Sequence, residues 1–110
     1  MAGMSISEHD WKVLRKLKPA ALERFCERIL RECCEVASAD GETFHERYLK
    51  LYEHIRKRDA QVAAVFDDLR RSRAFSAIAE IYELELLEEG EFLQFSGETR
   101  ERVLRILGRA

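Results

Sequence analysis

The sequence predicts an all-α protein built as a compact bundle of about five to six helices. One proline and five glycines in 110 residues leave few turn-forming residues, which argues against a β-sandwich or barrel. The composition is 46% hydrophobic and 36% charged, so the chain can form a core beneath an unusually charged surface. Apolar residues recur at steps of three and four, the period of one helix face. We expect a single helical domain over residues 1–110, with residues 1–6 as a loose leader.

The first two helices are expected on either side of Pro19. The first would cover residues 8–18 and begin at a cap on Ser7. The second would cover residues 19–39, because proline suits the first turn of a helix and Asp40-Gly41 is a typical helix stop. Its apolar residues follow one helix face and are Leu22, Phe25, Cys26, Ile29, Leu30, Cys33, Val36 and Ala37.

The three cysteines all fall in that second segment. Cys26 and Cys33 would lie about 10 Å apart along one helix axis, too far for a disulfide. The chain has neither a Cys-x-x-Cys motif nor a second Cys/His cluster at zinc spacing. We therefore expect free thiols packed in the core.

Three further helices are predicted from the remaining periodicity. One would cover residues 43–70, with a break or kink near Arg58-Asp59, because few apolar residues lie there and Asp can cap a new start. Another would cover residues 73–88. The last would cover residues 97–107, beginning at a cap near Ser96 and stopping at Gly108.

The stretch 81–95 is the predicted interaction surface. Its apolar residues cover more than one side of a helix, and such a surface must be buried in the bundle or against a partner. Residues 82–86 also alternate like a strand, so a short hairpin over 82–95 is the alternative. We expect this surface to mediate self-association through Ile81, Leu84, Leu87, Phe92 and Phe95.

Arginines outnumber lysines fourteen to five and could form local anion sites. A guanidinium group binds phosphate or carboxylate through two hydrogen bonds. The candidate anion-binding residues are Arg56, Arg58, Arg70, Arg71 and Arg73. The simpler interpretation of the second cluster is a set of exposed ion pairs with Asp67 and Asp68.

Charge is distributed unevenly along the chain. Residues 47–58 carry five bases and one acid, whereas residues 80–91 carry six acids and no base. Two such segments can pair within one molecule, meet across a dimer, or remain solvated.

Glu42-Thr43-Phe44-His45 has the Glu-x-x-His spacing found on helices of di-metal four-helix bundles. A complete site needs this spacing twice, and neither His9 nor His54 has a glutamate three residues earlier. Glu42 and His45 therefore supply at most part of a metal site, and the simpler interpretation of His45 is a polar residue in the first turn of a helix. We expect no cofactor and no catalytic residue, since the chain also lacks a phosphate-binding glycine loop.

The Ala39-Asp40-Gly41 motif followed by Glu46 resembles the helix-loop-helix signature of the TerB-like tellurite-resistance proteins. That family is all-helical. The resemblance covers residues 39–46 alone, and Arg47 stands where those proteins have an acidic residue. It therefore implies a helical fold and no metal site.

The sequence predicts a small cytoplasmic helical module for protein–protein interaction that self-associates as a homodimer or binds a protein partner. No uncharged run exceeds seven residues, whereas a membrane span needs about 20, so no membrane partner is expected. A net charge of −2 gives no general attraction for nucleic acid. The alternative is an adaptor or regulator that docks on nucleic acid or nucleoprotein through the arginine clusters. An enzyme or metal protein centred on His45 is a third hypothesis.

Overall fold

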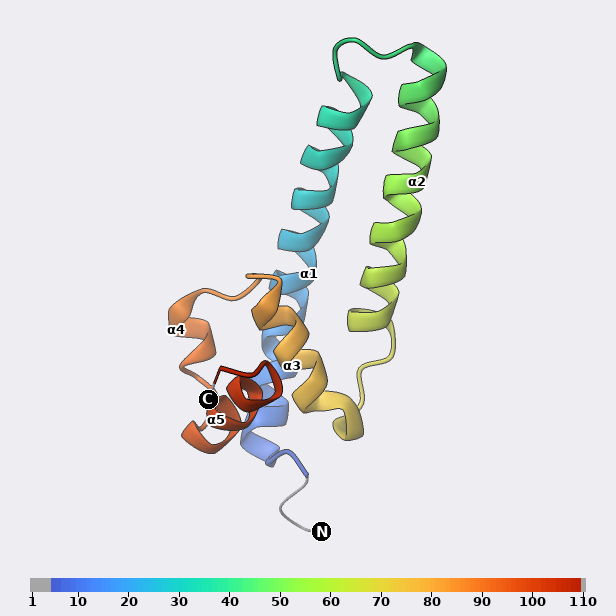
Figure 1. The fold of residues 1–110 in the computed structure, drawn as a ribbon. Coiled ribbons are helices and arrows are strands. Elements are labelled where there is room, and N and C mark those ends of the chain that lie inside the picture. Colours follow the sequence, from blue (N-terminus) through green and yellow to red (C-terminus); the bar gives the residue numbers. More distant parts are fainter. Residues whose placement is uncertain (1–4, 110) are drawn as a thin grey trace.

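The computed structural model describes residues 5–109, and this part of the chain forms five α-helices and no strand (Figure 1). The helices are α1 (Glu8–Ala37), α2 (Phe44–Val62), α3 (Ala74–Glu83), α4 (Glu89–Phe92) and α5 (Gly97–Ile106). The all-α prediction is confirmed. The alternative strand hairpin over 82–95 is wrong, because the end of α3, a turn and α4 occupy that stretch.

The molecule has two parts of different build. The antiparallel helices α1 and α2 rise well beyond the other three helices, which gather at the lower end of α1 in Figure 1. The radius of gyration is 16.9 Å, compared with about 13 Å for a compact domain of this length. We call residues 26–64 the hairpin and the other described residues the head.

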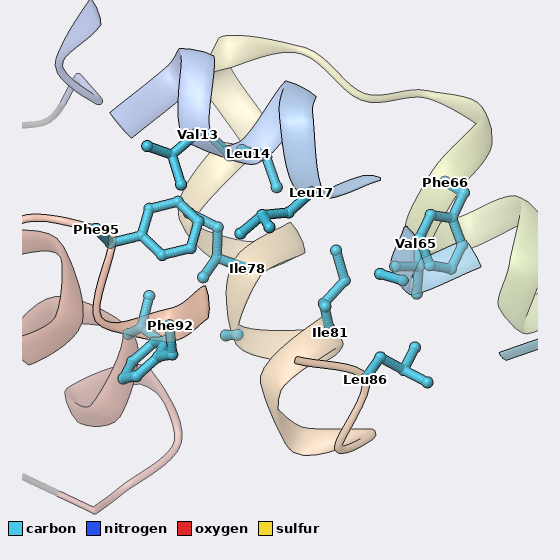
Figure 2. Close-up of a cluster of buried hydrophobic side chains, with 14 of the residues drawn as sticks. Val13, Leu14, Leu17, Val65, Phe66, Ile78, Ile81, Leu86, Phe92 and Phe95 are labelled. Carbon is cyan, nitrogen blue, oxygen red and sulfur yellow. The ribbon is translucent and has the colours of Figure 1, made fainter. Parts of the chain in front are cut away.

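All buried residues of the described chain lie in the head, where the apolar ones form one core (Figure 2). Buried residues occur up to Phe25 and again from Val65 onward. Figure 2 shows Leu14 and Leu17 of α1 in one cluster with Ile78 of α3 and Phe95 of the turn before α5. The first half of α1 is thus the central element of the head, while its second half belongs to the hairpin.

Pro19 lies inside α1, so the predicted boundary between two helices at this point is wrong. Proline removes one backbone N–H and crowds the carbonyl four residues earlier, which costs about 3 kcal/mol in a helix interior. Pro19 and Arg15 are both exposed, so this disruption lies on the solvent side of the helix. Leu14, Leu17 and Ala21 pack in the core along one continuous side, which holds both halves in one helix.

α2 continues through Arg58-Asp59, so the break predicted there is also wrong. Arg58 is anchored on α1, where it donates to the two oxygens of Glu32 at 2.9 and 2.6 Å. The helix changes instead at Ala63–Asp67, one turn of π-helix that carries the buried Phe66. The transition therefore occurs where the chain leaves the hairpin and enters the head.

α3 ends at Glu83, earlier than the predicted end near residue 88. The amide of Leu86 donates to the Ile81 carbonyl at 3.1 Å, and the amide of Glu85 donates to the Tyr82 carbonyl at 2.9 Å. This is the Schellman arrangement, in which the residue after the helix is left-handed and is usually glycine. Glu85 takes that role here with a φ of 58°, so the sequence carries no visible stop signal.

Two arginines of α1 hold the segment between α3 and α4. Arg28 donates to the Leu84 carbonyl at 2.6 Å, and Arg24 donates to the Leu86 carbonyl at 2.8 Å. Arg24 also binds both carboxylate oxygens of Glu91, at 2.6 and 3.0 Å, and these bonds lower the pKa of Glu91. The carbonyls at a helix end lack partners within the helix, so these cations satisfy them.

Asp10 connects the start of α1 to the start of α5. Its buried carboxylate accepts hydrogen bonds from the Ser96 amide at 2.9 Å, the Ser96 hydroxyl at 2.6 Å and the Thr99 hydroxyl at 2.5 Å. Burial acts to raise the pKa of Asp10, but the hydrogen bonds from Ser96 and Thr99 outweigh it and hold this pKa below its usual value. The charge also lies at the N-terminus of α5, where the helix dipole favours it.

The predicted start of the last helix at residue 97 is confirmed, and the helix ends at Ile106, one residue before its predicted end. α5 has Ser96 as its N-cap, and Gly108 follows it with a φ of 72°. Residues 1–4 of the predicted leader lie outside the described residues, whereas Ile6 is buried in the core of the head.

Candidate interaction surface

The hairpin has no buried residue. Every side chain from Cys26 to Ala64 is at least partly exposed, and α2 contributes none to the core. Six large apolar residues of the hairpin expose between 47% and 85% of their surface, and they are Leu30, Phe44, Tyr48, Leu49, Tyr52 and Ile55. An apolar surface of this size on a small protein needs an explanation.

Polar contacts identify the sides by which α1 and α2 face each other. His54 Nε2 lies 2.7 Å from the Glu32 carboxylate, which also binds Arg58. Nearer the tip, Arg47 donates to the Ala37 carbonyl at 3.1 Å. These contacts define two facing rows, which run at steps of three and four through positions 25, 29, 32 and 36 of α1 and 47, 51, 54 and 58 of α2.

Glu32 is the electrostatic centre of the facing rows. Its pKa is lowered, first because Arg58 donates two hydrogen bonds to it and further because His54 Nε2 forms one hydrogen bond with it, and together these outweigh the effect of burial. The same contact with Glu32 raises the pKa of Arg58. The pair therefore remains ionised at neutral pH and joins the two helices near the base of the hairpin.

One side of the hairpin is apolar. In an antiparallel pair of right-handed helices, residues one position after the facing rows turn to the same side, because each residue rotates by 100°. At the tip of the hairpin, where α1 leads into α2, Phe44 extends the row by one turn. From the tip to Ile55 these positions are uncharged, and the next position in the α2 row is Asp59. We call this set the apolar face: Cys26, Leu30, Cys33 and Ala37 of α1, with Phe44, Tyr48, Tyr52 and Ile55 of α2.

The opposite side of the hairpin is charged at every corresponding position. Residues one position before the facing rows turn to this second side by the same geometry. We call this set the charged face: Arg28, Arg31 and Glu35 of α1, with Glu46, Lys50, Glu53 and Lys57 of α2; Arg24 continues the α1 row into the head. The hairpin is therefore an amphipathic pair of helices whose apolar side has no cover from the described chain.

The head lies against the charged side. Arg24 and Arg28, at the base of the charged face, hold the segment after α3. Gln61 near the end of α2 and Ala64 of the π-helical turn line a cavity together with Glu83 of α3. These two residues continue the steps of the charged face past Lys57, so the apolar face turns away from the head.

The interaction surface predicted at 81–95 belongs instead to the core of the head. Ile81, Phe92 and Phe95 are buried, and Leu84 and Leu87 are partly buried against the same cluster. α3 ends early and α4 folds back over it, so that the ring centroids of Phe92 and Tyr82 lie 4.4 Å apart. In this fold the predicted surface is enclosed by the chain itself.

Each of the five candidate anion-binding arginines has a carboxylate partner. The pairs are Arg56–Glu53, Arg58–Glu32, Arg70–Asp68, Arg71–Glu8 and Arg73–Asp68. The pKa of Asp68 is lowered, mainly by hydrogen bonds from Arg70. Asp67 forms none of these pairs, although its spacing suggested that it would. A phosphate would therefore compete with a carboxylate at each arginine.

The two charged stretches do not pair with each other within the described chain. The acidic stretch 80–91 forms its ion pairs with Arg24 and Arg109. The basic stretch 47–58 forms its pairs with carboxylates of the hairpin itself. Pairing of the two stretches within one molecule is thus absent from residues 5–109.

Glu42 and His45 do not come together with further metal ligands. Glu42 lies 2.7 Å from Lys50 Nζ, and His45 is exposed. Across the described residues, no group of three or more His, Cys, Asp or Glu side chains is placed to hold a metal ion.

The cysteines are free, as expected, but their predicted place in the core is wrong. Cys26 and Cys33 are half-buried, and Cys34 is exposed. The reason is that most of this part of α1 extends beyond the head, where α2 packs against one side of it and the other sides stay largely exposed.

The apolar face was visible in the sequence only as part of a broader pattern. The facing row and the apolar face follow the same steps of three and four, displaced by one residue. Leu51 belongs to the first and Tyr52 to the second, and both fit one predicted helix. The signal that separates the apolar face from the facing row is a difference in charge. The positions one residue before the facing row are all charged, whereas those one residue after it are apolar except for Asp59.

Comparisons with protein-family models, curated proteins and solved structures find no match for this chain. The short resemblance to the TerB-like proteins at 39–46 thus gains no support from them. No helix of the described residues combines the length and the apolar character that a membrane span requires.

Proposed function

We propose that this protein is a protein–protein interaction module whose docking surface is the apolar face of the hairpin. The observation that carries the proposal is the contrast between the two sides of one helix pair. The residues of the apolar face are all uncharged, up to Asp59 at the next position of its α2 row, while every residue of the charged face is charged. Leaving the apolar side in water forgoes about 25 cal/mol for each Å² that a partner would cover.

The chemistry of the apolar face favours a protein partner. Phe44, Tyr48 and Tyr52 form one row on α2, and aromatic side chains are enriched in the cores of protein interfaces. A tyrosine buries its ring while its hydroxyl finds a partner at the rim. A nucleic acid would need a cluster of cations on the same surface, whereas the residues of the apolar face are uncharged and one guanidinium, that of Arg47, lies over the Phe44 ring at 4.5 Å from its centroid.

The arginine clusters offer less support for docking on nucleic acid. Arg70 and Arg71 would have to exchange Asp68 and Glu8 for phosphates. Such exchange gains little, because one anionic partner replaces another. A partner of the apolar face would displace mainly water, because its large side chains are exposed and Arg47, which lies over the Phe44 ring, is the cation that would have to adjust there.

A photoreactive amino acid placed at single positions of the full-length protein tests the proposal. We expect Tyr52 of the apolar face, when replaced by p-benzoylphenylalanine, to form discrete protein adducts in purified protein or in a lysate of the native host. Lys57 of the charged face is the matched control, since it lies on the same helix and is exposed. We expect few or no adducts from that position.

Two results would contradict the proposal. Adducts of equal yield from both positions would mean that contact is not selective for the apolar face. Absence of adducts from Tyr52, both in purified protein and in lysate, would mean that the apolar face docks no protein.

A further inference from the structure

We infer that the partner of the apolar face is the same face of a second copy, so that two hairpins form a four-helix bundle. This inference rests on the proposed function and names its partner. It would make the active form of the protein a symmetric dimer, in which identical residues contribute from both sides.

The spacing of residues on each helix favours a helical partner of this kind. A helix that packs on one neighbour needs one row of contacts, whereas a helix of a four-helix bundle contacts two neighbours and needs two adjacent rows. α2 has both: Leu51 and His54 lie in the facing row, and Tyr52 and Ile55 lie in the row beside it. α1 has both as well, with Ile29 in the first row and Leu30 in the second. Within the described chain only the first row of each helix is covered.

The size of the apolar face suits a dimer. Phe44, Tyr48 and Tyr52 each expose more than 60% of their surface. A buried aromatic side chain covers about 150–250 Å², so these three offer on the order of 400 Å². A standard interface takes about 800 Å² from each partner. Leu30, Ile55 and the smaller residues of the apolar face extend the area toward that value.

The position of the head leaves room for a second copy. The segment after α3 is held on the charged side by Arg24 and Arg28. When two apolar faces meet, both heads therefore lie on the outside of the bundle. The residues of the apolar face are uncharged, so like charges in the dimer are confined to its edges, at Asp59 and at Arg47, which lies over the Phe44 ring.

The decisive measurement is the absolute mass of the purified full-length protein by light scattering on a sizing column, across the micromolar range. We expect twice the 12.9 kDa of one chain. The dimer should persist at high salt, because an apolar interface is not screened as an ionic one is. A dimer that dissociates in salt would overturn the inference and point to ionic pairing.

Paired variants identify the surface involved. Tyr48→Glu with Tyr52→Glu places two carboxylates on the apolar face and should weaken dimerisation at least about a hundredfold. Lys50→Glu with Lys57→Glu places two carboxylates on the charged face of the same helix and should leave a dimer. Neither pair removes a buried residue, so both variants should fold, and circular dichroism checks this. A dimer that survives Tyr48→Glu with Tyr52→Glu would overturn the inference.

Hydrogen exchange supplies a second readout that needs no variant. Amides of residues 44–55 should gain protection as the wild-type concentration rises through the dissociation constant, while the head should not change. A purified protein that stays monomeric at every concentration would overturn the second copy as partner. If the protein stayed monomeric but Tyr52 formed adducts in the lysate, the proposed function would still stand with a different protein as partner. If no adduct formed in purified protein or in lysate, the proposed function would be wrong as well.

Discussion

The head and the hairpin are built from the same helix periodicity, yet only the head has a core. α1 passes through both: Leu14, Leu17 and Ala21 are buried in its first half, while Leu30 of the second half is exposed. α2 has no buried residue at all. Periodicity shows that a side of a helix is apolar, and it does not show whether the cover for that side comes from the same chain.

The same difference sets the stability of the two parts. The head has a packed core and polar contacts between distant elements, whereas the hairpin depends on one row of contacts between two helices. Helices without such packing are only marginally stable in water. We therefore expect the hairpin of a monomer to open locally at a lower free energy than the head.

The largest effect should come from truncating the core of the head. Phe95 is 2% exposed and its ring lies 6.3 Å from that of Phe92. Phe95→Ala should lower the free energy of unfolding by about 3–5 kcal/mol, because it leaves a cavity. Urea denaturation followed by circular dichroism measures the change. Tyr52→Ala is the matched variant on the hairpin and should change the monomer by less than about 0.5 kcal/mol.

Equal losses from Phe95→Ala and Tyr52→Ala in a monomer would contradict the division into a head with a core and a hairpin without one. A small loss in the free energy of unfolding from Phe95→Ala would mean that Phe95 is not a core residue. It would then support the interaction surface that the sequence predicted over residues 81–95.

Local signals in the sequence were sufficient for much of the head. Ser96 and Gly108 mark the limits of α5 because a cap hydroxyl and a left-handed glycine act within one turn. Pro19 misled the prediction, since its local cost is overcome by core packing that involves residues far along the chain. The end of α3 was missed because Glu85 stands where a glycine would have marked it.

The candidate site could not be located from the sequence for a different reason. Phe44, Tyr48 and Tyr52 look like core residues until the structure shows that no element lies over them. Phe92 and Phe95 look equally apolar, and they are buried only because the chain turns at Glu85 and brings α4 and the turn after it back onto the core of the head. Distinguishing the two sets requires the tertiary arrangement.

A second prediction concerns the carboxylate that ties α1 to α5 in the head. Asp10→Asn should lower the free energy of unfolding by about 2–3 kcal/mol, because it weakens the charged hydrogen bonds from Ser96 and Thr99. The pKa of Asp10 is lower in the folded protein than in the unfolded chain, where it is about 3.9. Its contribution is therefore complete above that pH and is lost as the pH falls through the lower folded value.

Unfolding measured at several pH values checks the sign of this effect. The difference between wild type and Asp10→Asn should be constant near neutral pH and should shrink in acid. A difference that grows as the pH falls below about 4 would contradict the lowered pKa.

A third, smaller effect should be confined to the hairpin. Glu32→Gln weakens the contacts with Arg58 and His54 and should cost about 1–2 kcal/mol. Because the pKa of Glu32 is also lowered, this contribution disappears as the pH falls below about 4.3. Hydrogen exchange at monomer concentrations should show faster exchange in α2 and unchanged exchange in α3. Faster exchange throughout the head would mean that the two parts unfold as one unit.

The smallest effect should be a gain in the head. Glu85 holds a φ of 58° at the end of α3, a conformation that glycine adopts without the clash of a Cβ atom. Glu85→Gly should therefore raise the free energy of unfolding of the head by about 0.5–1 kcal/mol. Glu85→Ala removes the same carboxylate but keeps the Cβ, so it should give no gain. If both variants stabilise the protein equally, the benefit comes from removing one charge of the acidic stretch rather than from the backbone. In either case exchange in the hairpin should not change, since Glu85 contacts it only through a backbone carbonyl bound to Arg28.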